Sequence, residues 1–372
     1  MSRPTRIFAD CHVFDGTPQG STTYLKGLYS ELIKDKDKMF YLAANDVKHL
    51  ERIFGRRDNV VYLKYRWHNK FMRLLFDIPA LVKKHSIDFA HFQYVVPPIK
   101  KCKYIVTLHD VLFMDFPQYF PLGYRLKNKF LFKLSAKYSD VVLTVSDYSK
   151  KRIRAHFNVD ALITPNAVDS IFFEPYDKAE VIRQVKNKYG IENYWLFVSR
   201  WEPRKNHLAL LKAFAEHGFH EKQQLVFIGD LALRNRTFDN YFAALPASVK
   251  DKVVFVYRIG FDDMLPLVRG ATLSAYPSIA EGFGIPPLES LAAKVPTICS
   301  NATAMSDFDF LMPYLFDPYN QADIAQKAKA AMQHEVSEET RKAVGGKYQW
   351  RNAADVFLKV VADAELVSAS RR

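Results

Sequence analysis

The chain alternates between two kinds of hydrophobic pattern. Short apolar runs, such as those in residues 103–113, 193–200 and 224–230, are typical of buried strands. Between such runs lie longer stretches, including residues 70–88 and 348–367, in which apolar positions recur at helical spacing. Strands that alternate with helices predict an α/β fold with parallel sheets.

The length of the chain predicts two domains. Its 372 residues exceed what one hydrophobic core usually supports, and two domains of roughly 150 to 200 residues are expected. An irregular, proline-containing segment at residues 165–175 places the boundary. We therefore predict a first domain at residues 1–168 and a second at residues 169–348, with residues 349–372 forming a last helix.

Composition indicates a folded protein of a reducing compartment. Apolar residues make up 49% of the chain and charged residues 25%, as in soluble domains. We see no apolar run of 18 residues and no signal-peptide core in the first ten, so we expect neither a membrane span nor secretion. The three cysteines lack metal-ligand spacing. A cytoplasmic location is expected.

Charge is distributed unevenly along the chain. The formal net charge is +13, and residues 1–165 carry all of this excess. Such asymmetry indicates an anionic partner for the first domain. Residues 62–76 and 119–137 interleave aromatic and aliphatic side chains with Lys and Arg, as in surfaces that contact anionic lipid. Ordinary amphipathic helices are the alternative interpretation. No nucleic-acid-binding motif is recognised, so no nucleic-acid partner is predicted.

One stretch, residues 272–298, combines a strand, a turn and a helix with two glutamates. Glu281 precedes Gly282 and Gly284, which would allow a ligand to approach the backbone closely. Glu289 follows eight positions later, inside the predicted helix. Loops at the carboxyl ends of parallel strands bind ligands, and helix starts attract anions. A solvated Glu281 and a helix-start Glu289 would be the purely structural alternative.

The segment EGFGIPPLE closely resembles the E-x7-E signature of the retaining glycosyltransferases of family 4. That family has the GT-B fold of two facing Rossmann-like domains, with a last helix that crosses back to the first. The resemblance implies that Glu281 contacts the donor sugar, that the loop of Gly282, Phe283 and Gly284 holds it through its amides, and that Glu289 binds the nucleotide ribose.

Three further segments resemble the same family. VTLHD matches a segment whose histidine lies beside the transferred sugar, which implies this role for His109. Arg200, Arg204 and Lys205 converge where a predicted strand meets a helix, and cations there suit a diphosphate. SRWEPRKN matches the family's pyrophosphate-binding segment through Arg200 and Lys205, with serine in place of a glycine. In the first loop, Gly20 matches one glycine near the donor diphosphate, while Thr22 stands where the second often falls.

The family's chemistry needs no metal, because cations and a helix dipole stabilise the leaving group. We therefore predict no metal and no cofactor, and we interpret the D-x-D spacing of Asp307 and Asp309 as incidental. Residues 304–313 are atypical, since the family's usual Pro-Glu-Val is missing before Phe316.

Together these patterns predict a retaining hexosyltransferase. We expect it to move a hexose, with mannose from GDP-mannose preferred over hexoses from UDP-sugars, to a hydroxyl of a lipid-linked glycan. The expected setting is bacterial surface polysaccharide synthesis, such as that of O-antigen, lipopolysaccharide or capsule. Its location would be cytoplasmic, with peripheral contact at the inner leaflet. The alternatives are a UDP-sugar-dependent transferase, an epimerase or phosphorylase of this fold, and a non-catalytic protein that binds sugar nucleotides or polyanions.

Overall fold

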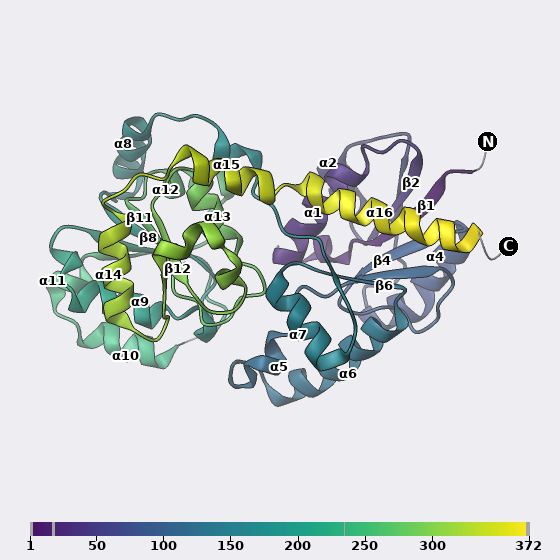
Figure 1. Cartoon of the computed structure of the whole chain (residues 1–372), viewed down its shortest axis with the longest axis horizontal. Helices are drawn as coiled ribbons and strands as arrows, with labels where there is room; N and C mark the ends of the chain where they lie inside the picture. The colour runs from purple at the N-terminus through teal and green to yellow at the C-terminus, as the bar shows by residue number, and fades with distance from the viewer. Residues whose placement is uncertain (1–2, 17–18, 234, 370–372) are drawn as a thin grey trace. The chain divides into compact units, whose positions relative to one another are not determined.

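The computed structural model describes residues 3–16, 19–233 and 235–369 (Figure 1). These residues form two compact units. Unit 1 contains the described residues up to Ala167 together with those from Gln349 onward, and unit 2 runs from Val168 to Tyr348. Both boundaries lie within one residue of the predicted ones.

Unit 1 is built on a parallel sheet. Within the described residues this sheet has seven strands in the order β3-β2-β1-β4-β5-β6-β7. The strands are β1 (Thr5–Asp10), β2 (Lys38–Ala44), β3 (Val60–Lys64), β4 (Phe89–Gln93), β5 (Lys103–Thr107), β6 (Val141–Thr144) and β7 (Leu162–Ile163). The helices are α1 (Gly20–Leu32), α2 (Val47–Phe54), α3 (Lys70–Met72), α4 (Ile78–Lys84), α5 (Leu112–Asp115), α6 (Leu122–Tyr138), α7 (Asp147–Phe157) and α16 (Trp350–Ala369).

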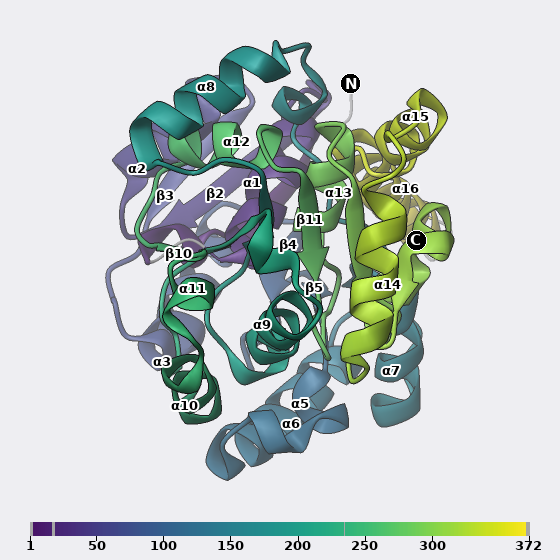
Figure 2. The same ribbon diagram turned by 90° about the vertical axis from the view of Figure 1, so that its left-hand side faces the viewer.

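Unit 2 has a second parallel sheet, in which the described strands follow the order β10-β9-β8-β11-β12-β13. These strands are β8 (Tyr194–Val198), β9 (Gln224–Ile228), β10 (Val253–Val256), β11 (Leu273–Tyr276), β12 (Thr297–Ser300) and β13 (Leu315–Phe316). The helices are α8 (Lys178–Tyr189), α9 (His207–Glu216), α10 (Arg236–Ala244), α11 (Ala247–Lys250), α12 (Phe261–Arg269), α13 (Ile285–Ala292), α14 (Gln321–Ala331) and α15 (Glu338–Lys347). Helix α8 contacts α12, and α9 contacts α14 (Figure 2). Both sheets confirm the predicted α/β class with Rossmann-like topology.

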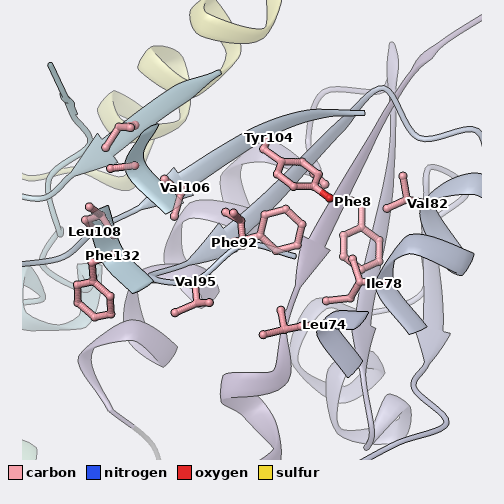
Figure 3. Packing of buried hydrophobic residues seen from close by; sticks show 14 of the residues in the cluster. Phe8, Leu74, Ile78, Val82, Phe92, Val95, Tyr104, Val106, Leu108 and Phe132 are labelled. Atoms are coloured by element: carbon pink, nitrogen blue, oxygen red, sulfur yellow. The ribbon is translucent and has the colours of Figure 1, made fainter. Parts of the chain in front are cut away.

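The core of unit 1 explains why its strands read as continuous apolar runs. Side chains on one face of the sheet, including Phe8, Phe92 and Tyr104, pack against Ile78 and Val82 of helix α4 (Figure 3). Helices cover parallel sheets on both faces, so strand residues are buried whichever way they point. The candidate site residues His109, Arg200, Lys205 and Glu281 lie beyond the carboxyl ends of the strands, in the loops that follow them.

The last helix belongs to unit 1, where α16 packs along α1 (Figure 1). Gly27 of α1 makes this contact possible. A Cβ atom there would lie 1.9 Å from the indole ring of Trp350, the first residue of α16. The indole therefore occupies the space that any larger residue at position 27 would need.

The helix expected over residues 70–88 is interrupted. Residues Lys70–Met72 are α-helical, Arg73–Asp77 form a π-helical segment, and α4 follows from Ile78 to Lys84. Pro79 has no N–H, and its ring would clash with the carbonyl four residues earlier in a regular helix. The wider turn before Pro79 relieves this clash, and in it the Ile78 amide donates to the Arg73 carbonyl oxygen.

Among the described helices, none is long and apolar enough to cross a membrane.

Candidate functional site

The candidate donor site lies at the topological switch point of the second sheet. The chain enters at β8, adds β9 and β10 on one side, and then returns to β11 on the other side of β8. Loops that leave neighbouring strands in opposite directions open a crevice at the carboxyl ends. The loop after β8 carries Arg200, Arg204 and Lys205, and the loop after β11 carries Glu281.

These two loops are joined at several points. The Ile279 amide donates to the Arg204 carbonyl oxygen at 2.8 Å, and Nη1 of Arg204 donates to the Ala280 carbonyl oxygen at 2.6 Å. The Glu281 carboxylate accepts a hydrogen bond from Nζ of Lys205, and its other oxygen lies 3.1 Å from Arg204 Nη1. The main chain and the charged groups thus hold Glu281 in one orientation.

The loop after β8 needs a glycine opposite it. Gly229, directly after β9, has a φ of +145°, and a Cβ atom there would lie 2.0 Å from the Ser199 carbonyl oxygen. The backbone therefore approaches more closely than any side chain would allow. Ser199 itself replaces the glycine usual in the resembled family, and the structure accommodates it beside Gly229.

Burial and charge set the ionisation of the pair. Desolvation favours the neutral acid, but the charges of Lys205 and Arg204 outweigh it and lower the pKa of Glu281 to about 2. Burial lowers the pKa of Lys205, and the nearby Arg204 lowers it further, against the opposing effect of Glu281. The carboxylate is therefore firmly ionised, while the ammonium group has lost part of its hydration.

Arg204 belongs to this cluster, as expected from its place beside Arg200 and Lys205, and Glu202 is a member that the sequence analysis did not identify. Glu202 lies 2.8 Å from Arg204 and 3.7 Å from Arg200, so its carboxylate connects the two guanidinium groups. The side chain of Arg200 is 55% exposed, compared with 16% for Lys205. The structure therefore brings Lys205 and Glu281 together directly and leaves Arg200 at the rim.

The glycine loop before α13 has a specific shape. Gly284 caps the helix with a φ of +101°, and a Cβ atom there would lie 3.1 Å from Met305. The Phe283 side chain is buried against Phe308 and Tyr348. Its ring therefore supports the loop from behind, and only its amide can fulfil the predicted ligand role.

Two prolines limit what the start of α13 can donate. Pro286 and Pro287 occupy the first turn and have no N–H. Of the four amides that a helix start leaves without intrahelical partners, those of Gly284 and Ile285 remain as donors. The start of α13 therefore offers an anion two free backbone amides instead of the usual four.

Glu289 lies within α13 and is partly buried. Burial, together with the negative charge of Asp169, raises the pKa of Glu289 to about 7. The described contacts do not join Glu289 to Arg200, Arg204 or Lys205. A carboxyl group that is half-neutral near pH 7 can donate or accept hydrogen bonds, which suits the predicted contact with ribose hydroxyls.

In unit 1, the predicted residue His109 follows β5 and is buried. Desolvation lowers the pKa of His109 to about 3, so the imidazole is neutral at physiological pH. Its Nε2 lies 2.6 Å from Oε1 of Gln93, and the Tyr24 ring packs edge-on at 4.9 Å between centroids. Gln93 was missed because a glutamine at a strand end carries no motif.

Gly20 begins helix α1 and is exposed, and a Cβ atom there would meet no described atom within 4 Å. Residues 17–18, which precede this start, lie outside the described residues. Thr22 has a capping role. Its hydroxyl accepts from the Gln19 amide and donates to the Val13 carbonyl oxygen. This explains a threonine where the resembled family often has glycine.

The D-x-D pair lies in the atypical segment, which forms two 3-10 turns at Thr303–Asp307 and Asp309–Tyr314. Asp309 forms an ion pair with Lys347 at 3.5 Å. Across the described parts of the chain, no group of three His, Cys, Asp or Glu side chains is arranged to hold a metal. Metal independence stays a prediction.

With this geometry established, comparison with known proteins identifies the family. A profile described as Glycosyltransferase Family 4 matches residues 18–171, and one described as Glycosyl transferases group 1 matches residues 178–349. The chain belongs to the family 4 glycosyltransferases and has their GT-B fold, as the sequence motifs predicted.

Two curated relatives are mannosyltransferases by name. O-antigen chain mannosyltransferase B of Escherichia coli is 26% identical over 342 residues, covering 85% of this chain and 87% of that protein. O-antigen chain mannosyltransferase RfbU of Salmonella typhimurium is 31% identical over 201 residues, covering 53% of this chain and 51% of that protein. The second match thus spans about half of each protein.

Among solved structures, the sucrose-phosphate synthase of Thermosynechococcus elongatus superposes with a TM-score of 0.76 at 16% identity. The superposition covers 98% of this chain and 100% of that one. At this identity the likeness concerns the fold alone.

Proposed function

We propose that this glycosyltransferase is a retaining hexosyltransferase of bacterial surface polysaccharide assembly. The donor is a nucleotide sugar, with GDP-mannose as the first candidate, and the acceptor is a hydroxyl of a lipid-linked glycan. The names of the two O-antigen mannosyltransferase relatives support the choice of mannose and of this setting.

The proposal rests on the hydrogen bonds that Lys205 and Arg204 donate to the Glu281 carboxylate. Three cations meet two carboxylates here, so the cluster keeps a net positive charge for a diphosphate. Lys205 and Arg200 bind the diphosphate and stabilise the charge that develops as it leaves. Glu281, held ionised, accepts hydrogen bonds from sugar hydroxyls. Glu289 binds the ribose. Because positively charged groups already stabilise the leaving group, the proposed reaction requires no metal.

His109 presents the neutral imidazole of the first unit. A neutral ring can accept a hydrogen bond from a sugar hydroxyl without adding charge. We assign it this contact by analogy with the family.

The test is a donor screen followed by product analysis. Thermal shifts with GDP-mannose, UDP-glucose and their free diphosphates identify the donor. Transfer to a lipid-linked glycan and determination of the new anomeric bond then show whether configuration is retained. The proposal predicts transfer with retention. Inversion would overturn the mechanism, UDP-hexose preference would overturn the mannose assignment, and binding without turnover would favour a sugar-nucleotide sensor.

We further propose that residues 62–76 and 119–137 form one membrane-binding surface on unit 1, which we call the basic aromatic surface. Helix α6 exposes Leu122, Leu126, Phe130 and Leu134 at four-residue intervals. Nζ of Lys127 lies 5.7 Å from the ring centroid of exposed Phe71, so the two segments adjoin.

Basic side chains beside exposed apolar ones suit the headgroup region of an anionic bilayer. The three cysteines are free, which supports the cytoplasmic side of that bilayer. The ammonium group of Lys127 lies over the exposed ring of Phe71, so charge and apolar surface are presented together.

Vesicle sedimentation tests this surface. The protein should bind vesicles that contain phosphatidylglycerol and bind pure phosphatidylcholine vesicles weakly. Leu126→Ser should weaken binding, whereas Leu366→Ser, an equally exposed leucine on α16, should not. Equal binding by both variants, or no preference for anionic lipid, would remove this surface from the account.

A further inference from the structure

Behind His109 lies a chain of buried hydrogen bonds. Nε2 of His109 is 2.6 Å from Oε1 of Gln93, and Nε2 of Gln93 is 3.2 Å from Nε2 of His91. Nδ1 of His91 is in turn 3.1 Å from the Tyr29 hydroxyl. All four side chains are buried. Gln93 therefore connects the two histidines through the two polar atoms of its amide.

The sheet register creates this arrangement. His91 and Gln93 are two positions apart on β4, so their side chains leave the same face of the strand. Gln93 pairs with Thr107, the last residue of β5, and His109 follows two residues later. The hydroxyl of Thr107 also lies 2.8 Å from Nε2 of His91.

The amide of Gln93 gives the chain a direction, because its nitrogen can only donate and its oxygen can only accept. Nε2 of His91 must then accept from Gln93, which places the His91 proton on Nδ1, facing the Tyr29 hydroxyl. By the same logic, Nε2 of His109 must carry a proton and donate it to Gln93. Nδ1 of His109 is left with its lone pair.

Neither His91 nor His109 is positively charged at pH 7. Burial lowers the pKa of His91 and of His109 to about 3 in each case, so both rings are neutral at pH 7. The choice lies between two neutral tautomers, and the neighbouring hydrogen bond decides it. Among the described residues, none forms a hydrogen bond with Nδ1 of His109.

We propose that Gln93 is a positioning residue for glycosyl transfer. Its side-chain oxygen holds the proton of His109 on Nε2, so that Nδ1 meets the ligand as a hydrogen-bond acceptor for a sugar hydroxyl. The role of His109 toward the sugar rests on the proposed function, whereas the tautomer is a property of the protein alone. In the opposite tautomer, Nδ1 would donate and could not accept from that hydroxyl.

Nuclear magnetic resonance of the ¹⁵N-labelled protein, with long-range correlations between ring protons and nitrogens, identifies the tautomer directly. His109 should show protonated Nε2 at pH 7. Gln93→Met should lose this preference, whereas Gln93→Glu, which keeps an acceptor oxygen, should retain it. Tyr24→Phe is the control and should keep the tautomer, because the Tyr24 ring touches His109 while its hydroxyl bonds Thr164 and Thr107 rather than the histidine.

Kinetics with the active donor complete the test. Gln93→Met should lower kcat by roughly 10- to 100-fold, because the reactive geometry is lost, while KM for the donor changes little. Gln93→Glu should recover much of this rate. Protonated Nδ1 in the native protein, or a native tautomer in Gln93→Met, would overturn the proposal. A native protein that transfers no sugar would overturn the proposed function instead and leave the tautomer result to decide this one.

Discussion

Glu281 and Lys205 form an ion pair between the loops that follow two adjacent parallel strands, β11 and β8. The pair therefore lies at the switch point of the sheet, where this class of fold binds its ligands. The Lys205 side chain is largely buried, and its ammonium group is paired with the Glu281 carboxylate instead of being hydrated. An incoming diphosphate would find a cation that is already oriented and partly desolvated, which costs less reorganisation at the moment of reaction.

Replacing Lys205 should abolish nucleotide binding. At 100 times its Kd, a ligand adds about 2.7 kcal/mol to stability, which raises Tm by roughly 5–10 °C in a unit of this size. We expect GDP-mannose to produce such a shift in the native protein and no shift in Lys205→Ala. Lys294→Ala, which removes an exposed lysine paired with Glu338, should keep the full shift. A persistent shift in Lys205→Ala would place the diphosphate elsewhere.

Acid should destabilise the native protein through Glu281. Its folded pKa of about 2 lies below the ordinary value of 4.5, so the ionised form stabilises the fold above pH 4.5. This contribution is lost as the pH falls from 4.5 toward 2. Glu281→Gln should lack this loss, with a difference of about 1–3 kcal/mol between the ends of the range. Urea denaturation at pH 2.5 and 5.5 measures it, and parallel pH profiles would contradict it.

Glu289 should have the opposite effect on stability. Its folded pKa of about 7 lies above 4.5, so the folded protein resists ionisation and stability falls as the pH rises from 4.5 to 7. Glu289→Gln removes that cost and should stabilise the protein by about 1–3 kcal/mol at pH 8 while leaving it nearly unchanged at pH 4.5. The same variant should weaken nucleotide binding. Urea denaturation at the two pH values decides the first point, and a uniform effect would refute it.

Gly27 should tolerate no side chain, because Trp350 fills the space beside it. Gly27→Ala should therefore cost about 1–3 kcal/mol of stability by displacing the start of α16. Gly123→Ala is the matched control. Gly123 lies in α6, a Cβ atom there meets no described atom within 4 Å, and alanine should add about 0.5 kcal/mol. Thermal unfolding of both variants measures the difference, and equal changes would mean that α16 is not docked as described.

Sequence reasoning identified the features that depend on local pattern. Buried strands such as residues 224–228 are apolar because helices cover both faces of a parallel sheet. Glu281 and Lys205 were also identified, because each lies in a short segment whose spacing is particular to the family. Local pattern and family resemblance thus led to the same two loops.

What sequence reasoning missed depends on contacts between distant segments. Gln93 gains its role only because the register of β4 and β5 places it against His109. To predict the π-helical segment before Pro79, one would need to know that the chain widens a helical turn there and does not end the helix. Glu289 shows a third limit, because its raised pKa depends on burial and on Asp169, neither of which its spacing from Glu281 reveals.

We propose that the sugar is transferred from its nucleotide at the cluster of Lys205, Arg204 and Glu281. The most direct measurement is the transfer of radiolabelled mannose from GDP-mannose to a lipid-linked glycan, with GDP binding measured in parallel, for the native protein and Glu281→Gln. We predict that Glu281→Gln binds GDP nearly as well as the native protein while its transfer rate falls at least about 100-fold. Equal transfer by the two proteins would contradict the account.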